Sequence, residues 1–123
     1  MILVDTSVWI AHLRVGDERL ISLLDAGDVL GHPFVIGELA LGNLRQRNTV
    51  LSGLQDLPQA ASASHAEVLH FIAREGLFGR GIGYVDAHLL ASARLTATAR
   101  LWTRDRRLQA AAVRLGLAAN LPQ

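Results

Sequence analysis

The chain has 123 residues, half of them hydrophobic, a formal net charge of +1, and neither cysteine nor lysine, so all twelve Lys and Arg positions are arginine. This length is enough for one domain, spanning residues 1–123, and too short for two. The composition excludes disulfides, thiol chemistry and lysine-dependent mechanisms, and the sequence contains no run of 18 uncharged apolar residues that would predict a transmembrane helix.

The N-terminal half predicts short strands alternating with helices. Apolar residues directly precede Asp5, as in a buried strand of a parallel sheet, and no basic segment of a signal peptide comes before them. We therefore expect a cytoplasmic protein without a membrane anchor. The first elements expected in this half are a strand over residues 2–4, a helix capped by Thr6 or Ser7, and a second helix over residues 17–24. A strand at 29–30 and helices over 33–44 and 48–57 should follow.

The C-terminal half continues the alternation after a glycine-rich loop. The spacing of these glycines does not match a dinucleotide-binding fingerprint. The expected elements are a helix capped by Ser64, a loop over 76–83, a helix over 84–96, a strand over 100–103, a helix over 104–115, and a final strand or tail over 117–121. Alternating strands and helices predict an α/β fold with a central parallel sheet of about four or five strands, covered by helices on both faces.

Four acidic residues occupy positions where a carboxylate is costly unless it is used. Asp5 ends an apolar strand, Glu38 lies in the apolar helix VIGELAL, Asp86 lies near the start of the helix in GYVDAHLL, and Asp105 follows the strand LWT. In open α/β sheets, ligands bind at the carboxyl ends of the strands and at neighbouring helix N-termini. At least three of the four are therefore expected to converge at one edge of the sheet.

Converging carboxylates repel one another, and a hard cation relieves that repulsion. Mg²⁺ or Mn²⁺ prefers oxygen ligands, acidifies a bound water and stabilises a phosphoryl oxygen during attack, so the expected chemistry is phosphodiester hydrolysis. Each acid also has a structural alternative. Asp5 and Asp105 can serve helix N-termini, Asp86 can favour a helix dipole, and Glu38 can be an exposed helix position.

Four motifs in order resemble those of the PIN-domain family, specifically the VapC-type toxins. They are VDTSVWI with Asp5, VIGELALGNL with Glu38, GYVDAHLLASA with Asp86, and LWTRDRRL with Thr103 and Asp105. The resemblance spans nearly the whole chain, and the ordered set is more specific than any single motif. One departure is Leu108, where family members often have phenylalanine, and this affects packing more than chemistry.

The resemblance implies a PIN-like three-layer α/β/α domain and a metal-dependent endoribonuclease that is the toxin of a VapBC-type module. It implies Mg²⁺ or Mn²⁺ held by Asp5 and Asp86, with Glu38 and Asp105 completing the acidic pocket. The supporting hydroxyls it implies are those of Ser7, Thr103 and Thr6. It further implies an RNA substrate, a VapB-like antitoxin and frequent homodimers.

Contacts with RNA and with an antitoxin are expected at two different places. Arginine forms charge-assisted pairs with phosphate, although a solvated basic face is the structural alternative. The arginines expected near the acidic edge are Arg80, Arg104, Arg106 and Arg107. The leucine-rich segments 12–24 and 48–57 are expected to leave a groove for an amphipathic antitoxin helix, although they can also face the core or form a homodimer.

Other functions compete with the toxin reading. A metal-dependent DNA nuclease, or a PIN-type nuclease in RNA processing, would use the same acidic residues, and only small size favours the toxin. A catalytically silent PIN-fold binding module would be expected to lack one or more of the acids, and all four are present. A purely structural helical protein leaves Asp5, which directly follows an apolar strand, unexplained.

Overall fold

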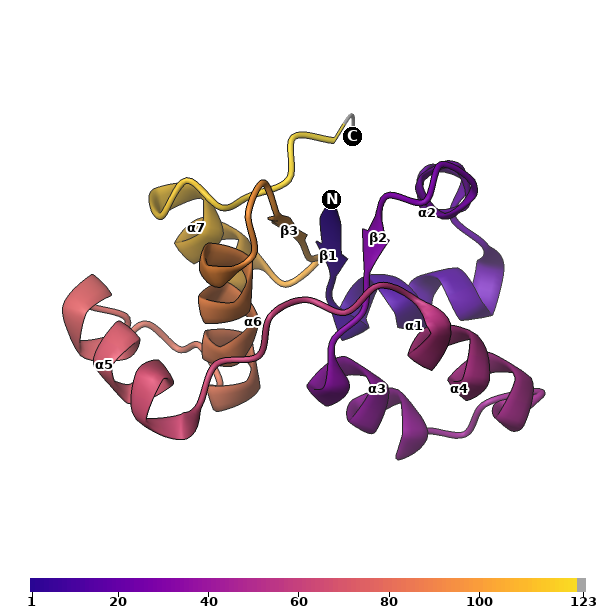
Figure 1. Cartoon of the computed structure of the whole chain (residues 1–123), viewed down its shortest axis with the longest axis horizontal. Coiled ribbons are helices and arrows are strands. Elements are labelled where there is room, and N and C mark those ends of the chain that lie inside the picture. The colour runs from indigo at the N-terminus through magenta and orange to yellow at the C-terminus, as the bar shows by residue number, and fades with distance from the viewer. Residues whose placement is uncertain (122–123) are drawn as a thin grey trace.

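The computed structural model describes residues 1–121, and its centre is a parallel sheet of three strands. The strands are β1 (Ile2–Val4), β2 (Val29–Leu30) and β3 (Arg100–Trp102), in the order β2-β1-β3 (Figure 1). Ile2 lies in register with Val29 on one side and Arg100 on the other. The first strand is therefore central, and the residue that follows it leaves the sheet at the middle of its carboxyl edge.

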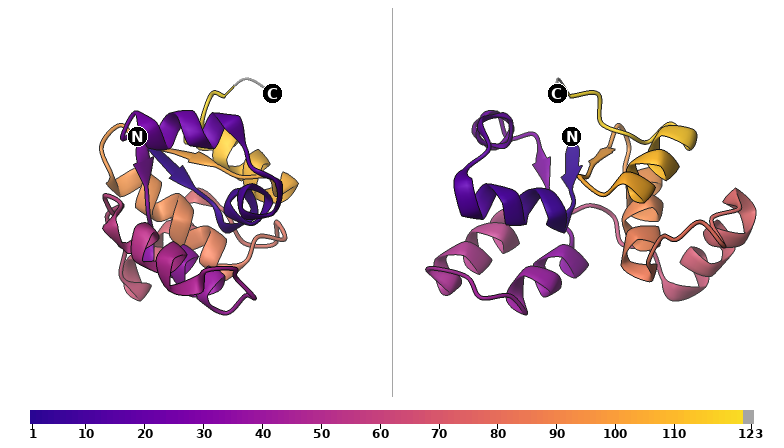
Figure 2. Two further views of the ribbon diagram at one scale, coloured as in Figure 1. Left: turned by 90° about the vertical axis from the view of Figure 1, so that its right-hand side faces the viewer. Right: turned by 180° about the vertical axis from the view of Figure 1, so that it is seen from behind.

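Helices lie on both sides of these strands and confirm the predicted α/β/α fold. In Figure 1, α1–α4 lie on one side and α5–α7 on the other, and Figure 2 shows the arrangement from two further directions. The helices are α1 (Thr6–Val15), α2 (Glu18–Asp25), α3 (Pro33–Ala40), α4 (Arg47–Asp56), α5 (His65–Glu75), α6 (Tyr84–Leu95) and α7 (Arg106–Arg114).

The described sheet is narrower than the four or five strands expected. At its edges the chain makes one isolated parallel bridge beyond each outer strand, Gly31 with Gln59 and Leu101 with Ala118. Gly31 donates to the carbonyl oxygen of Pro58 at 2.8 Å, and Ala60 donates to that of Gly31 at 2.9 Å. Proline cannot donate to a strand ladder, which limits pairing at this edge. The two bridges thus mark where a fourth and a fifth strand would lie.

One helix ends earlier than its apolar pattern predicts. The expected helix continued to Leu44, but α3 ends at Ala40, and the N–H of Gly42 turns back to the carbonyl oxygen of Leu39 at 3.0 Å. Residues 41–46 are consequently not helical and form an irregular segment that connects α3 to α4. This segment later forms one wall of a groove.

Burial of the central strand fixes the position of the residue at its end. Leu3 and Val4 are completely buried and pack in one core with Leu89, Leu101 and Leu108. Because these side chains lock the register of β1, the backbone at position 5 is held at the edge of the sheet. None of the helices described for residues 1–121 is long and apolar enough to cross a membrane.

Candidate active site

Asp5 lies where the central strand meets the first helix. Its N–H donates to the carbonyl oxygen of Trp102 at 2.9 Å, which joins the ends of β1 and β3. Its side chain is buried, with the residue only 6% exposed. One carboxylate oxygen, Oδ2, accepts hydrogen bonds from Ser7 Oγ and Thr103 Oγ1, both at 2.7 Å. No hydrogen bond from the described residues reaches the other oxygen, Oδ1.

The two hydroxyls that hold Asp5 are themselves oriented by the start of the last helix. Ser7 Oγ accepts the N–H of Arg104, and Thr103 Oγ1 accepts the N–H of Asp105, each at 3.0 Å. A hydroxyl carries one proton, so these backbone donors leave each proton to point at the carboxylate. The arrangement ties α1, the residue after β3 and the N-terminus of α7 to one carboxylate oxygen.

Asp105 begins α7 beside this cluster. Its Oδ1 accepts the N–H of Leu108 at 2.9 Å, as an N-cap residue does. The structural role that the sequence left open for Asp105 is therefore present. The side chain is nevertheless exposed and carries a second oxygen.

Glu38 projects from the exposed face of α3 toward the same region. Its Oε1 accepts a hydrogen bond from Thr6 Oγ1 at 2.6 Å. Thr6 is the first residue of α1, directly after Asp5. The hydroxyl of Thr6 therefore holds Glu38, whereas those of Ser7 and Thr103 hold Asp5, a division that the sequence did not predict.

The pKa of Asp86 responds to the charges of the other three predicted acidic residues. Burial raises the pKa of the Asp86 carboxyl, a hydrogen bond from the N–H of Gly83 lowers it, and the negative charges of Asp5, Asp105 and Glu38 raise it further. The Gly83 hydrogen bond is 3.2 Å long and reaches Oδ2. Like charges raise a carboxyl pKa only when they lie near it.

The donor set suits a hard divalent cation. The groups brought together are carboxylates and hydroxyls, which are the oxygen ligands that Mg²⁺ and Mn²⁺ prefer. Within residues 1–121, no three acidic or histidine side chains stand close enough together to enclose a metal ion by themselves. An ion here would rely on water for the rest of its coordination, as Mg²⁺ commonly does.

The four predicted RNA-contacting arginines are all exposed, but they differ in surroundings. Arg104 and Arg106 line a cavity of about 390 Å³ that Thr103 and Asp105 also line. The other two contact the glycine loop. Arg80 Nε donates to the carbonyl oxygen of Gly76 at 2.7 Å, and the guanidinium of Arg107 lies over Gly81.

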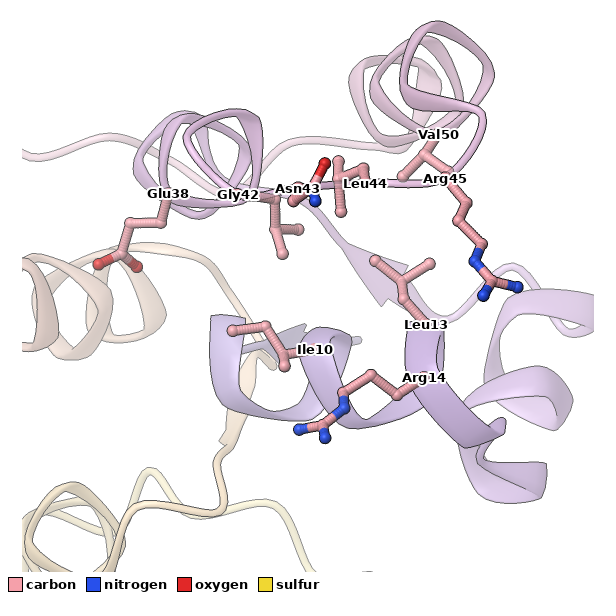
Figure 3. A pocket seen from close by; sticks show the side chains of 10 residues that line it. Ile10, Leu13, Arg14, Glu38, Gly42, Asn43, Leu44, Arg45 and Val50 are labelled. Atoms are coloured by element: carbon pink, nitrogen blue, oxygen red, sulfur yellow. The ribbon is translucent and has the colours of Figure 1, made fainter.

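A groove of about 520 Å³ begins at Glu38 and runs between α1 and the α3–α4 connection. Figure 3 shows Ile10 and Leu13 on one wall and Val50 on the other, with the guanidinium groups of Arg14 and Arg45 beside them. The sequence placed such a groove at segments 12–24 and 48–57. Its observed lining includes α1 and α4 but not α2, and the irregular segment after α3 supplies the remaining wall.

No local pattern predicts Arg14 and Arg45 as groove residues. Each is an exposed arginine without a motif around it, and only the early end of α3 brings Arg45 opposite α1. The hydrogen bond between Thr6 and Glu38 likewise could not be predicted from local sequence patterns, because the two residues are 32 positions apart.

Comparisons with known proteins agree with the α/β fold and identify the family. A PIN-domain family model matches residues 2–114. The chain is also 54% identical over 118 residues to proteins named Ribonuclease VapC32 from two strains of Mycobacterium tuberculosis, CDC 1551 / Oshkosh and ATCC 25618 / H37Rv. Each alignment covers 96% of this chain and 95% of the relative.

Proposed function

This chain belongs to the PIN-domain family, and on that premise we propose that it is a metal-dependent endoribonuclease acting as the toxin of a VapBC-type toxin–antitoxin module. The observation that carries the proposal is that the negative charges of Asp5, Glu38 and Asp105 lie near enough to Asp86 to raise its pKa. The relatives named Ribonuclease VapC32 support both the reaction and the toxin role.

The four carboxylates would hold Mg²⁺ or Mn²⁺, which would supply an acidified water and charge neutralisation for phosphodiester hydrolysis. Ser7 and Thr103 hold Oδ2 of Asp5 by hydrogen bonds, which fixes the orientation of the carboxylate and leaves Oδ1 available to bind an ion. Thr6 restrains Glu38 in the same way. A carboxylate whose rotamer is already fixed loses little conformational entropy on binding a ligand.

Arginines next to the carboxylates would position the RNA backbone. Arg104 and Arg106 share a cavity with Asp105, so a phosphate bound there would lie beside the acidic residues. Arg80 and Arg107 are also proposed contacts; Arg107 of α7 lies over Gly81 and would hold the glycine loop against α7, whereas Arg80 bonds Gly76 within the loop. RNA is the polyanion that would be cut, so the protein would act in the cytoplasm.

An antitoxin of the VapB kind would occupy the groove that begins at Glu38. The walls at Ile10, Leu13 and Val50 are apolar, which suits the apolar face of an amphipathic helix. Such a segment could place a cationic side chain near Glu38 and compete with the metal for its charge. A homodimer stays a prediction, which sedimentation of the purified protein would test.

The decisive experiment compares Asp5→Asn with the wild-type protein. The substitution keeps the shape of the side chain and removes its charge, so the fold should persist while Mg²⁺-dependent RNA cleavage falls by at least about 100-fold. Asp56→Asn, at the exposed end of α4, is the matched control and should cleave at the wild-type rate. EDTA should abolish wild-type cleavage, and an Asp5→Asn protein that remains fully active would overturn the proposal.

Two alternatives have separate tests. A PIN-type nuclease of RNA processing would cleave RNA yet lack an inhibitor, so the wild-type protein should be co-expressed with the product of any short reading frame immediately upstream. Co-purification and inhibition would support the toxin role. A catalytically silent binding module would bind RNA with Mg²⁺ or Mn²⁺ present and leave it intact.

A further inference from the structure

Five aromatic and imidazole rings form a continuous row between α3 and α6. Phe34 meets His32 and His88 with ring centroids 5.5 and 4.5 Å apart, and His88 meets Tyr84 at 4.6 Å, all edge to face. His65 completes the row, because its Nδ1 lies 2.6 Å from the Tyr84 hydroxyl. None of these contacts is used by the proposed reaction.

The inner part of the row, at His32 and His88, is rigidly held, whereas the rings of Phe34, Tyr84 and His65 are exposed. His32 Nδ1 accepts the N–H of Phe34 at 3.0 Å, and its Nε2 lies 2.9 Å from the hydroxyl of buried Ser92. His88 is buried as well. In contrast, Phe34 is 38% exposed and Tyr84 is 45% exposed. The row therefore presents two aromatic surfaces on a fixed base.

One of these surfaces, the Phe34 ring, lies on the face of α3 that carries Glu38, and the row ends on the first turns of α6, which carry Asp86. Phe34 precedes Glu38 by four residues on α3, a spacing that puts their side chains on the same face, about 5–6 Å apart at Cβ. Tyr84 and His88 stand two residues before and after Asp86 on α6, so their side chains lie on a different face of the helix from Asp86 and meet the row through His88 and Phe34. The contact between Phe34 and His88 thus joins α3 and α6 within about one helical turn of the proposed site.

We propose that Phe34 and Tyr84 are a stacking platform for bases of single-stranded RNA next to the bond that is cleaved. This inference rests on the proposed ribonuclease function and adds the part of the substrate that the arginines do not contact. Unpaired RNA bases commonly stack on exposed aromatic side chains, and stacking tolerates any sequence because every base has a π face. The substrate class indicated is an unpaired RNA segment rather than an A-form duplex, whose bases are already stacked.

The test measures RNA binding in the Asp5→Asn protein with EDTA present, so that cleavage does not interfere. The probe is a short single-stranded oligoribonucleotide of mixed sequence, carrying fluorescent aminopurine bases. Phe34→Leu combined with Tyr84→Leu keeps apolar bulk and removes both aromatic faces. Phe78→Leu is the matched control, since Phe78 is 70% exposed and lies in the glycine loop outside the row. Thermal unfolding of each variant, and of Tyr84→Leu alone, checks that the fold persists.

We expect the double variant to weaken binding about tenfold and to lose the quenching of aminopurine fluorescence that stacking causes. The slope of log affinity against log salt should stay unchanged, because no phosphate contact is removed. Phe78→Leu should bind like its parent. Equal binding by the double variant and its parent, an equal loss in Phe78→Leu, or no binding by the parent protein would overturn the platform. Those results leave the nuclease proposal to the separate cleavage assay of Asp5→Asn.

Discussion

Asp5 is restrained by two hydroxyls that each have a backbone N–H behind them. Two hydrogen bonds form a relay: the N–H of Asp105 donates to Thr103 Oγ1, and the hydroxyl proton of Thr103 is donated to Asp5 Oδ2. Because the hydroxyl has a single proton, it can donate only to Asp5. Neighbours that orient a metal-binding carboxylate commonly matter almost as much as the ligand itself. The hydroxyl of Thr103 should therefore affect both stability and activity.

Thr103→Val tests this relay, because valine keeps the shape of threonine and removes the hydroxyl. The loss leaves the N–H of Asp105 without its acceptor and Asp5 with one donor, which should cost about 1–3 kcal/mol of unfolding free energy. RNA cleavage should fall about 10- to 100-fold without being abolished. Thr98→Val is the control, since the Thr98 hydroxyl bonds only the adjacent carbonyl oxygen of Ala97. If both variants behave alike in urea unfolding and cleavage assays, the relay does not orient Asp5.

His32 makes the stability of the fold depend on pH. Burial, and to a lesser extent the charge of His88, lowers its pKa from 6.5 to about 4. The unfolded chain therefore takes up a proton at this residue before the folded protein does. Its contribution to stability is complete above about pH 6.5 and is lost as the pH falls toward about 4.

Between pH 7.5 and 5 this single residue should lower the unfolding free energy by about 2 kcal/mol. Urea unfolding at the two pH values would measure the loss in the wild-type protein. His32→Asn should be less stable than the wild-type protein at both pH values, but its unfolding free energy should fall by about 2 kcal/mol less from pH 7.5 to pH 5 than that of the wild-type protein. The exposed His70 provides a control, and His70→Gln should keep the wild-type difference. A His32→Asn protein with the full pH dependence would show that other groups cause it.

Among the elements, α7 combines a structural and a chemical role at its first turn. Asp105 caps the helix through one oxygen and adds negative charge beside Asp86 through the carboxylate as a whole. Asp105→Asn keeps an oxygen for the cap and removes the charge, so stability should persist while cleavage falls. Asp105→Ala removes both and should also cost about 1 kcal/mol of unfolding free energy. Full RNA-cleavage activity of Asp105→Asn would show that Asp105 serves only as the N-cap of α7 and not in the proposed reaction.

The bounds of most elements could be predicted because apolar spacing and caps are local. Ser64 and Glu67 form the expected reciprocal cap of α5, and Pro33 begins α3 as expected. The end of α3 was predicted too late, since Leu44 continues the apolar spacing although the chain turns at Gly42. The edges of the sheet depend on pairing between distant segments, such as Gly31 with Gln59, and no local pattern reports that pairing.

At the scale of the whole molecule, the acidic site assembles from parts separated by almost the entire chain. Asp5 and Thr103 are 98 residues apart and share a hydrogen bond. The four acidic residues could be predicted as site candidates from the sequence, because each one interrupts or follows an apolar run. The sequence could not assign Thr6 to Glu38, or find the ring contact between Phe34 and His88, because those depend on how α3 packs against α1 and α6.

This assembly predicts that metal binding and folding are linked. If the four carboxylates form the proposed site, the folded protein brings together charges that the unfolded chain keeps apart, so Mg²⁺ should bind the folded state preferentially and stabilise it. At a free Mg²⁺ concentration about tenfold above its dissociation constant, the gain should be about 1.4 kcal/mol, which raises the unfolding midpoint by several degrees. Calorimetry with and without Mg²⁺ would measure the shift, with Na⁺ added to equal ionic strength as the control.

The same measurement on Asp5→Asn combined with Asp86→Asn separates specific binding from general screening. The substitutions remove two of the four negative charges proposed to bind the ion while keeping the shape of both side chains. The unfolding midpoint of this variant should therefore no longer respond to Mg²⁺. If the variant and the wild-type protein gain equally from Mg²⁺, the ion stabilises the fold elsewhere, and these carboxylates are not its ligands.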